Sequence, residues 1–145
     1  MKLQYILLLL LLCTPVLALD SITDFVHDEA DILNASLEAE LRDVLGGMAR
    51  EGVVEMAVVT INSLEGESKE EYALRLAHDK LGDKEEDNGL LLLIALEEQE
   101  YRVEVGYGLE GVLNDAKVGR FAREFLVPSF KEGKYDEGVA IFTNA

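Results

Sequence analysis

The chain has 145 residues, with 13 basic and 29 acidic side chains and a formal net charge of −16 at pH 7. A chain of this length holds one domain of ordinary size. Such an excess of acid repels phosphate backbones, so nucleic acid is excluded as an expected partner. Divalent cations and basic protein surfaces are favoured instead, although acidity also serves simply to keep a domain soluble.

The first 18 residues have the pattern of an export signal. Lys2 precedes an apolar run over residues 6–12, and Ala18 is a small residue at a suitable cleavage point. The run is shorter than the roughly 20 residues that a membrane-spanning helix needs. We therefore predict a removed signal peptide, or a retained N-terminal membrane segment, over residues 1–18 and a single domain over residues 19–145. Either way the protein is expected outside the cytoplasm, secreted or membrane-tethered.

The elements predicted for the first half of the chain follow from hydrophobic spacing and capping residues. A helix begins at Asn34 or Ser36 and has an apolar stripe at helical spacing. Residues 53–61 are rich in β-branched side chains and predict a buried strand. Ser68 and Glu71 have the spacing of a capping box and open a second helix. No strand is predicted before the first helix.

The second half of the chain begins with two strands. Residues 90–96 are continuously apolar, as in a central strand covered on both faces, and residues 101–105 alternate between apolar and charged side chains. A third helix follows, which Pro128 ends or kinks, and a last helix begins over residues 135–142. The order α-β-α-β-β-α-α predicts a small sheet with helices on both faces.

Several kinds of chemistry are disfavoured by the residue inventory. The only cysteine, Cys13, lies in the signal segment, so the domain has neither a disulfide nor a cysteine nucleophile. His27 and His78 are too few for a typical zinc site, and neither has a matching serine motif for acyl transfer. An EF-hand beginning at Asp83 would place Ile94 where a carboxylate is required.

Residues 106–111 match the pattern G-x-G-x-x-G and follow a predicted strand. A nucleotide phosphate would be repelled by Glu110 inside the loop, and no βαβ partner with a ribose-binding acid accompanies it. We therefore expect no nucleotide cofactor and interpret the glycines as a turn that needs positive φ.

Carboxylate and amide oxygens stand at the ends of the predicted elements and form the candidate metal site. If residues 90–96 and 101–105 pair as an antiparallel hairpin, the start of the first strand lies beside the loop that follows the second. Oxygen ligands gathered at one sheet edge suit Ca²⁺ or Mg²⁺. The alternative is that these residues only form turns and helix caps. The candidates are Asp28, Asp87, Asn88, Glu110 and Asp115.

Four stretches in order along the chain resemble the TPM domain family. They are residues 26–33, 88–94, 103–110 and 128–138, and the third, a strand ending in G-x-G-hydrophobic-E, is the most recognisable. The resemblance covers about residues 24–142. It implies a three-layer α/β/α sandwich around a small mixed sheet of about four strands, located outside the cytoplasm and often beside a membrane.

The resemblance also implies functions. Family members bind Ca²⁺ or similar ions, one thylakoid-lumen member is reported as an acid phosphatase, and others are accessory factors for membrane protein complexes. By motif position, Asp28, Asn88, Glu110 and Asp115 are the implied metal ligands, with Asp87 in second rank.

Three hypotheses follow for the domain, which we expect to be a monomer. The first is a cation-binding accessory module near a membrane or membrane protein complex. The second is a metal-assisted acid phosphatase of low activity, with Asp28 or Asp115 as base or nucleophile. Its phosphate would have to be held by Arg102, Lys117 or Arg120. The third is an interaction domain without metal.

Overall fold

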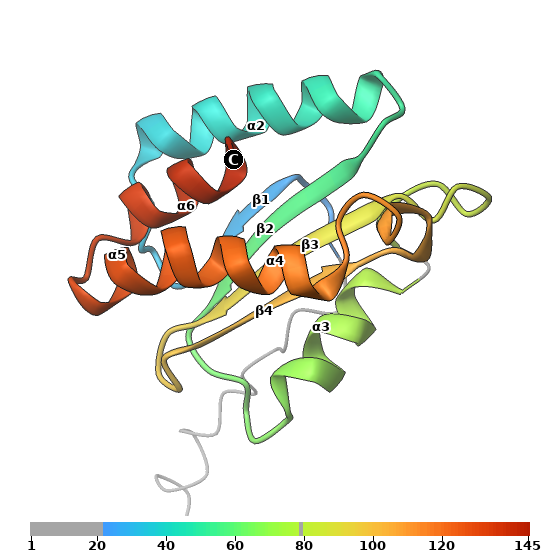
Figure 1. Ribbon diagram of the computed structural model, residues 1–145. Coiled ribbons are helices and arrows are strands. Elements are labelled where there is room, and N and C mark those ends of the chain that lie inside the picture. Colours follow the sequence, from blue (N-terminus) through green and yellow to red (C-terminus); the bar gives the residue numbers. More distant parts are fainter. Residues whose placement is uncertain (1–21, 79) are drawn as a thin grey trace, which may run out of the picture.

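The computed structural model describes residues 22–78 and 80–145 (Figure 1). At its centre is a four-stranded sheet in the order β1-β2-β3-β4. The first three strands are parallel and the fourth is antiparallel to its neighbour, so the sheet is mixed, as expected. The predicted signal segment lies outside the described residues. The strands are β1 (Val26–Asp28), β2 (Glu55–Ile61), β3 (Gly89–Ala95) and β4 (Glu100–Val105).

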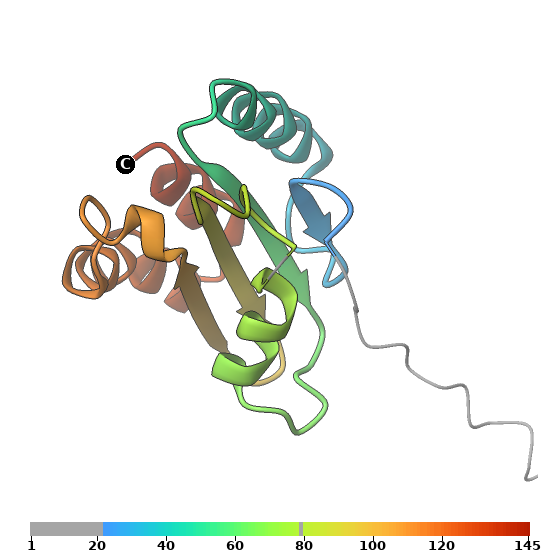
Figure 2. The ribbon, with the colours of Figure 1, turned by 90° about the vertical axis from the view of Figure 1, so that its right-hand side faces the viewer.

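Helices cover both faces of the sheet, which confirms the predicted sandwich. One face carries α3, and the opposite face carries α2 together with the C-terminal helices (Figures 1 and 2). Within the described residues, no helix combines the length and the apolar character needed to span a bilayer. The helices are α2 (Ala35–Arg50), α3 (Lys69–Ala77), α4 (Asp115–Phe121), the π-helical turn η2 (Ala122–Leu126), α5 (Val127–Lys131) and α6 (Tyr135–Thr143), and a short 3-10 turn, η1 (Tyr107–Leu109), precedes α4.

Each face of the sheet has its own apolar core. Every residue of β3 is buried, which confirms it as a strand covered on both sides. Along β3, Leu91 and Leu93 face α3, whereas Leu90, Leu92 and Ile94 face α2 and the C-terminal helices. The sheet is therefore held from both sides, and its strand ends are fixed platforms for the loops.

The first two helices begin where the capping residues predict. The Asn34 side chain accepts a hydrogen bond of 2.9 Å from the Leu37 N–H, so Asn34 rather than Ser36 is the N-cap of α2. The Ser68 hydroxyl accepts from the Glu71 N–H at 3.2 Å and donates to the Glu71 carboxylate at 2.9 Å. These contacts satisfy backbone donors that the first turn of a helix leaves without partners.

Two predictions about the elements are wrong. Strand β1 was not expected, because three residues are too few to show alternation; it pairs with residues 58–60 of β2 at the sheet edge. Of the two roles predicted for Pro128, ending the third helix is wrong, because helical structure continues to Lys131 through the π-helical turn η2. The proline follows this π-helical turn, at the first positions of α5.

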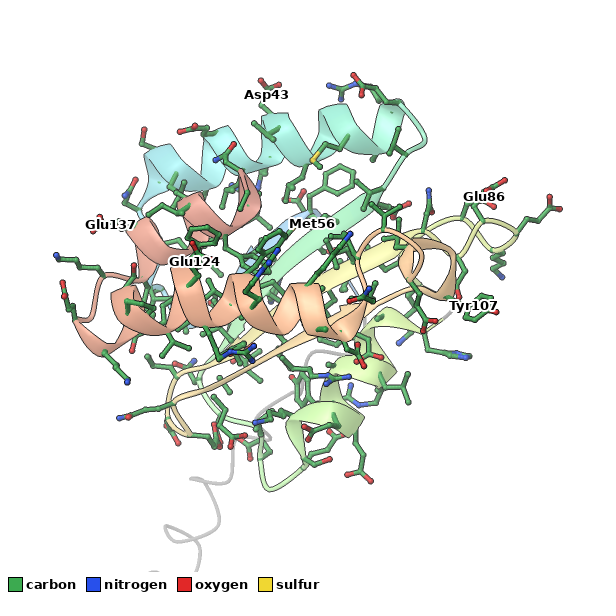
Figure 3. All side chains as sticks on the ribbon, viewed as in Figure 1. Asp43, Met56, Glu86, Tyr107, Glu124 and Glu137 are labelled. Carbon is green, nitrogen blue, oxygen red and sulfur yellow. The ribbon has the colours of Figure 1, made fainter. Side chains whose placement is uncertain are left out.

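The negative charge is spread over the whole surface. Asp43 on α2, Glu86 in the loop before β3, Glu124 and Glu137 all project outward from different elements, whereas Met56 lies inside (Figure 3). Such a distribution fits a general role of the acid in solubility. The distribution of charge alone therefore does not locate a functional site.

Candidate functional site

The loops before β3 and after β4 lie side by side, as the predicted hairpin requires. The register of β3 and β4 is antiparallel and brings Leu90 opposite Val105. The Tyr107 N–H donates to the Asp87 carboxylate at 2.9 Å, and the Gly108 N–H donates to the Asp87 carbonyl oxygen at 3.0 Å. Asp87 therefore joins the two loops through both its side chain and its backbone.

The glycines at positions 106 and 108 are required by close approach, not by positive φ. Neither has a positive φ, so the expected positive-φ turn is wrong. A Cβ atom on Gly106 would collide with the Asp87 carbonyl oxygen, and one on Gly108 with that of Glu86. The G-x-G pattern therefore lets one loop pack directly onto the backbone of the other.

Asn88 is buried and fully engaged in holding this end of the molecule. Its Oδ1 accepts from the Asp83 N–H at 2.8 Å, and its Nδ2 donates to the Gly52 carbonyl oxygen at 3.2 Å. The side chain thereby ties the loop before β3 to the connection between α2 and β2. Its amide oxygen already has a partner, so the residue positions the loops.

Asp28 lies at the opposite end of the sheet. It ends β1 and pairs with Thr60, whose neighbour in β3 is Ile94, near the end of that strand. Asn88, by contrast, immediately precedes β3. The expected convergence of Asp28 with the other candidates is therefore not found. Strand β1 runs parallel to β3, so its carboxyl end points away from the loop before β3 and the loop after β4.

The Asp28 carboxylate holds the turn that leads into α2. It accepts from the Ile32 N–H at 3.2 Å and the Leu33 N–H at 2.8 Å, and the Thr60 hydroxyl donates to it as well. Both carboxylate oxygens are thus engaged. Buried backbone donors need such acceptors, so these contacts account for an acid at this position without a ligand.

The last two candidates lie at different places. Glu110 is exposed and follows η1 in the loop that packs on Asp87. Asp115 is exposed at the start of α4 and lines a groove along β4 with Arg102. The N-cap of α4 is Asn114, whose side chain accepts from the Lys117 N–H at 3.1 Å.

A pocket of about 290 Å³ lies at the open end of the β3–β4 hairpin, opposite its turn, between α3 and the two loops. Asp83 and Asp87 both line it. One oxygen of Asp83 accepts from the N–H groups of Glu85 and Glu86, at 2.8 and 3.1 Å, which lowers the pKa of the Asp83 carboxyl below its ordinary value. The second oxygen of Asp83, and one of Asp87, accept no hydrogen bond from the described residues.

The described residues contain no group of three or more His, Cys, Asp or Glu side chains arranged to hold a metal ion. A cation here would accordingly have two carboxylates, neighbouring oxygens and water as ligands. Ca²⁺ takes six to eight oxygen ligands and Mg²⁺ usually keeps several waters, so such an incomplete protein shell is chemically suitable but weak.

The cations considered for a phosphate site are engaged elsewhere. Arg102 forms an ion pair with Glu104 at 2.9 Å, and the Lys117 Nζ donates to the Val112 carbonyl oxygen at 2.7 Å. The Arg120 guanidinium lies 5.6 Å from the centre of the Phe121 ring. None of these contacts gathers positive charge beside Asp115.

The fold and these contacts define an α/β/α domain in which the loop before β3 and the loop after β4 meet at the open end of the β3–β4 hairpin. The profile of the TPM domain family matches residues 26–145, which is most of the chain. The chain therefore belongs to the TPM domain family. A search of curated proteins gave no match.

Solved structures that are similar to this chain include two N-terminal domains. The N-terminal domain of a protein from P. gingivalis has 36% sequence identity and a TM-score of 0.75, with 83% of this chain and 77% of that one covered. The N-terminal domain of the cg2496 protein from Corynebacterium glutamicum has 16% identity and a TM-score of 0.64, with 89% and 78% covered. The second likeness is one of fold only.

Proposed function

We propose that the protein is an exported accessory module that acts near a membrane protein complex. It holds Ca²⁺ or Mg²⁺ at the open end of the β3–β4 hairpin, opposite the turn. The observation that carries the cation site is that Asp83 and Asp87 line one pocket and each keeps one carboxylate oxygen without a hydrogen bond among the described residues. Glu110, exposed on the adjoining loop, does not line this pocket, so the two aspartates are the proposed carboxylate ligands.

A cation at this place would act as a cross-link between loops. Asp83 and Asp87 belong to the loop before β3, and the Asp87 carboxylate also accepts a hydrogen bond from the Tyr107 N–H in the loop after β4. Neutralising their charge would favour the closed packing of the two loops, and binding to the folded state alone would raise stability by mass action. With few protein ligands, we expect dissociation constants on the order of 10⁻⁴ to 10⁻³ M, as in weak extracellular calcium modules.

The contacts give less support to the acid phosphatase considered from the sequence. Both oxygens of Asp28 accept hydrogen bonds from backbone N–H groups or the Thr60 hydroxyl, which assigns this carboxylate a structural role in the fold. Asp115 is accessible, but both cations that line its groove are paired, Arg102 with Glu104 and Lys69 with Glu100.

Titration with CaCl₂ and with MgCl₂, followed by backbone NMR, tests the cation site. We expect fast-exchange shifts in residues 83–89 and 106–110 that are lost in Asp83→Asn/Asp87→Asn. Asp43→Asn, on the exposed side of α2 (Figure 3), is the matched control. The proposal fails if no shifts occur up to about 10 mM cation, well above the expected range, or if they centre on Asp28. A domain without any such shift would be an interaction module without metal.

A further inference from the structure

The outer edge of β4 presents backbone groups that β3 does not use. The Gly106 N–H donates to the Gly89 carbonyl oxygen. Every second residue of an antiparallel strand bonds to its neighbour, so Glu100, Arg102 and Glu104 are the residues of β4 that bond to β3. The backbone N–H and C=O groups of Tyr101, Val103 and Val105 therefore point away from the sheet. No loop or side chain in the described part of the chain is hydrogen-bonded to them.

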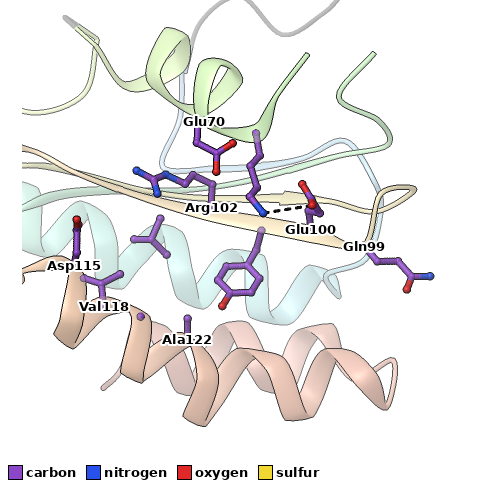
Figure 4. Close-up of a pocket in the computed structure, with 11 residues that line it drawn as sticks. Glu70, Gln99, Glu100, Arg102, Asp115, Val118 and Ala122 are labelled. Atoms are coloured by element: carbon purple, nitrogen blue, oxygen red, sulfur yellow. Dashed lines mark ion pairs between the residues drawn. The ribbon is translucent and has the colours of Figure 1, made fainter. Parts of the chain in front are cut away.

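The part of this edge at Tyr101 and Val103 forms the floor of a groove of about 470 Å³ between two helices. Lys69 and Glu70 of α3 line one side, and residues of α4 and η2, among them Asp115, line the other (Figure 4). The two helices thus flank β4 on both sides of the sheet. A groove with an open strand edge as its floor has the shape needed to admit one extended polypeptide.

The groove has one uncompensated carboxylate on each wall. Lys69 forms an ion pair with Glu100 at 3.4 Å, and Arg102 forms one with Glu104 at 2.9 Å. Glu70 makes no ion pair with the described residues, and neither does Asp115. An occupant of this groove should therefore contribute positive charge.

The two walls differ in their remaining character. On the α4 side, Val118, Gly119 and Ala122 provide an apolar surface of mostly small residues. Side chains of an extended strand point alternately to the two sides. Apolar residues of an added strand would then lie on the α4 wall, and basic residues between them would lie on the α3 wall near Glu70.

We propose that the β4 edge binds an extended segment of a partner protein, in which apolar and basic residues alternate, as a fifth strand of the sheet. This inference goes beyond the cation site and does not depend on it. A second copy of this chain is the less suitable occupant, because two domains with a net charge of −16 each repel one another.

A synthetic peptide of alternating valine and lysine, acetylated and amidated, is the probe. Hydrogen exchange of the protein is followed by NMR in EDTA, so that loss of the cation cannot affect the result. We expect exchange to slow at the amides of Tyr101 and Val103, which form the floor of the groove. The amides of Arg102 and Glu104 already bond to β3 and should change little. A peptide with glutamate in place of lysine should bind more weakly.

Two variants test the groove itself. Neutralising the wall carboxylate that faces the basic residues, in Glu70→Gln, should weaken peptide binding about two- to fivefold, as for an exposed ion pair. Gly119→Leu should block the groove, because Gly119 lines it. The variant should still fold, since a Cβ there meets only the end of the Arg123 side chain, at 3.2 Å. Gly47→Leu, on the remote helix α2, is the matched control for adding leucine to a helix.

Three results would overturn the inference. The first is the absence of slowed exchange at the outward amides with peptide in excess. The second is binding that is unchanged in Glu70→Gln, whose surface substitution leaves the fold intact, and in Gly119→Leu. The third is slowed exchange at the same amides without peptide, rising with protein concentration, which would assign the edge to a second copy of the chain.

Discussion

Replacing Asp28 by asparagine separates a structural role of this residue from a chemical one. The carboxylate accepts two backbone N–H groups, from Ile32 and Leu33, and the Thr60 hydroxyl. Asparagine has the same shape but only one acceptor oxygen. Its amide group would face a backbone donor, and one N–H in a partly buried turn would lose its acceptor.

The expected cost follows from these three contacts. A buried donor left without a partner costs about 1 to 3 kcal/mol. The two remaining hydrogen bonds lose the assistance of a charge, which adds about 0.5 to 1 kcal/mol each. We therefore expect Asp28→Asn to lower the free energy of unfolding by about 2 to 5 kcal/mol, a large part of the total for a small domain.

Urea unfolding at neutral pH, monitored by circular dichroism, measures this change. Asp43→Asn serves as the control, because Asp43 makes no hydrogen bond or ion pair with the described residues and should change stability by less than about 0.5 kcal/mol. The reasoning is refuted if Asp28→Asn unfolds like the wild type yet abolishes cation-induced shifts or phosphate-ester hydrolysis. Asp28 would then be a ligand or a catalytic group.

Three further predictions concern the loops and caps. Gly108→Ala should destabilise the domain by about 1 to 3 kcal/mol in urea unfolding, because its Cβ would collide with Glu86, whereas Gly111→Ala, with open space around it, should be nearly neutral. The stability that Asp83 contributes is the difference in unfolding free energy between the wild type and Asp83→Asn. This difference should be present above the ordinary pKa of 3.8 and should disappear as pH falls through the lowered pKa of the folded state. A difference that does not depend on pH between neutrality and pH 2 would contradict this. Ser68→Ala should cost about 0.5 to 2 kcal/mol and speed amide exchange in the first turn of α3, and unchanged exchange there would count against the cap.

Local signals in the sequence were sufficient for most elements. Asn34 and Ser68 mark their helices because a capping side chain acts on backbone donors two or three residues away. The hairpin of β3 and β4 follows from two adjacent strand patterns and a short turn. In each case the deciding interaction lies within a few residues along the chain, where spacing is informative.

The position of Asp28 could not be predicted, because it depends on a pairing between distant residues. A strand of three residues shows no alternation, and its direction is set by pairing with residues 58–60 of β2. The direction decides to which end of the sheet Asp28 belongs. Asp83 was passed over for a related reason, since its role depends on the buried Asn88 and not on the spacing of an EF-hand.

The motif residues shared with the TPM family are, for the most part, engaged in holding the chain together. Asp28 fixes the turn into α2, Asn88 joins two loops, and Gly108 permits their contact. A match to such residues is therefore strong information about fold and weak information about chemistry. Function has to be sought in carboxylates and backbone groups that the fold leaves available, which are those of the hairpin pocket and of the β4 edge.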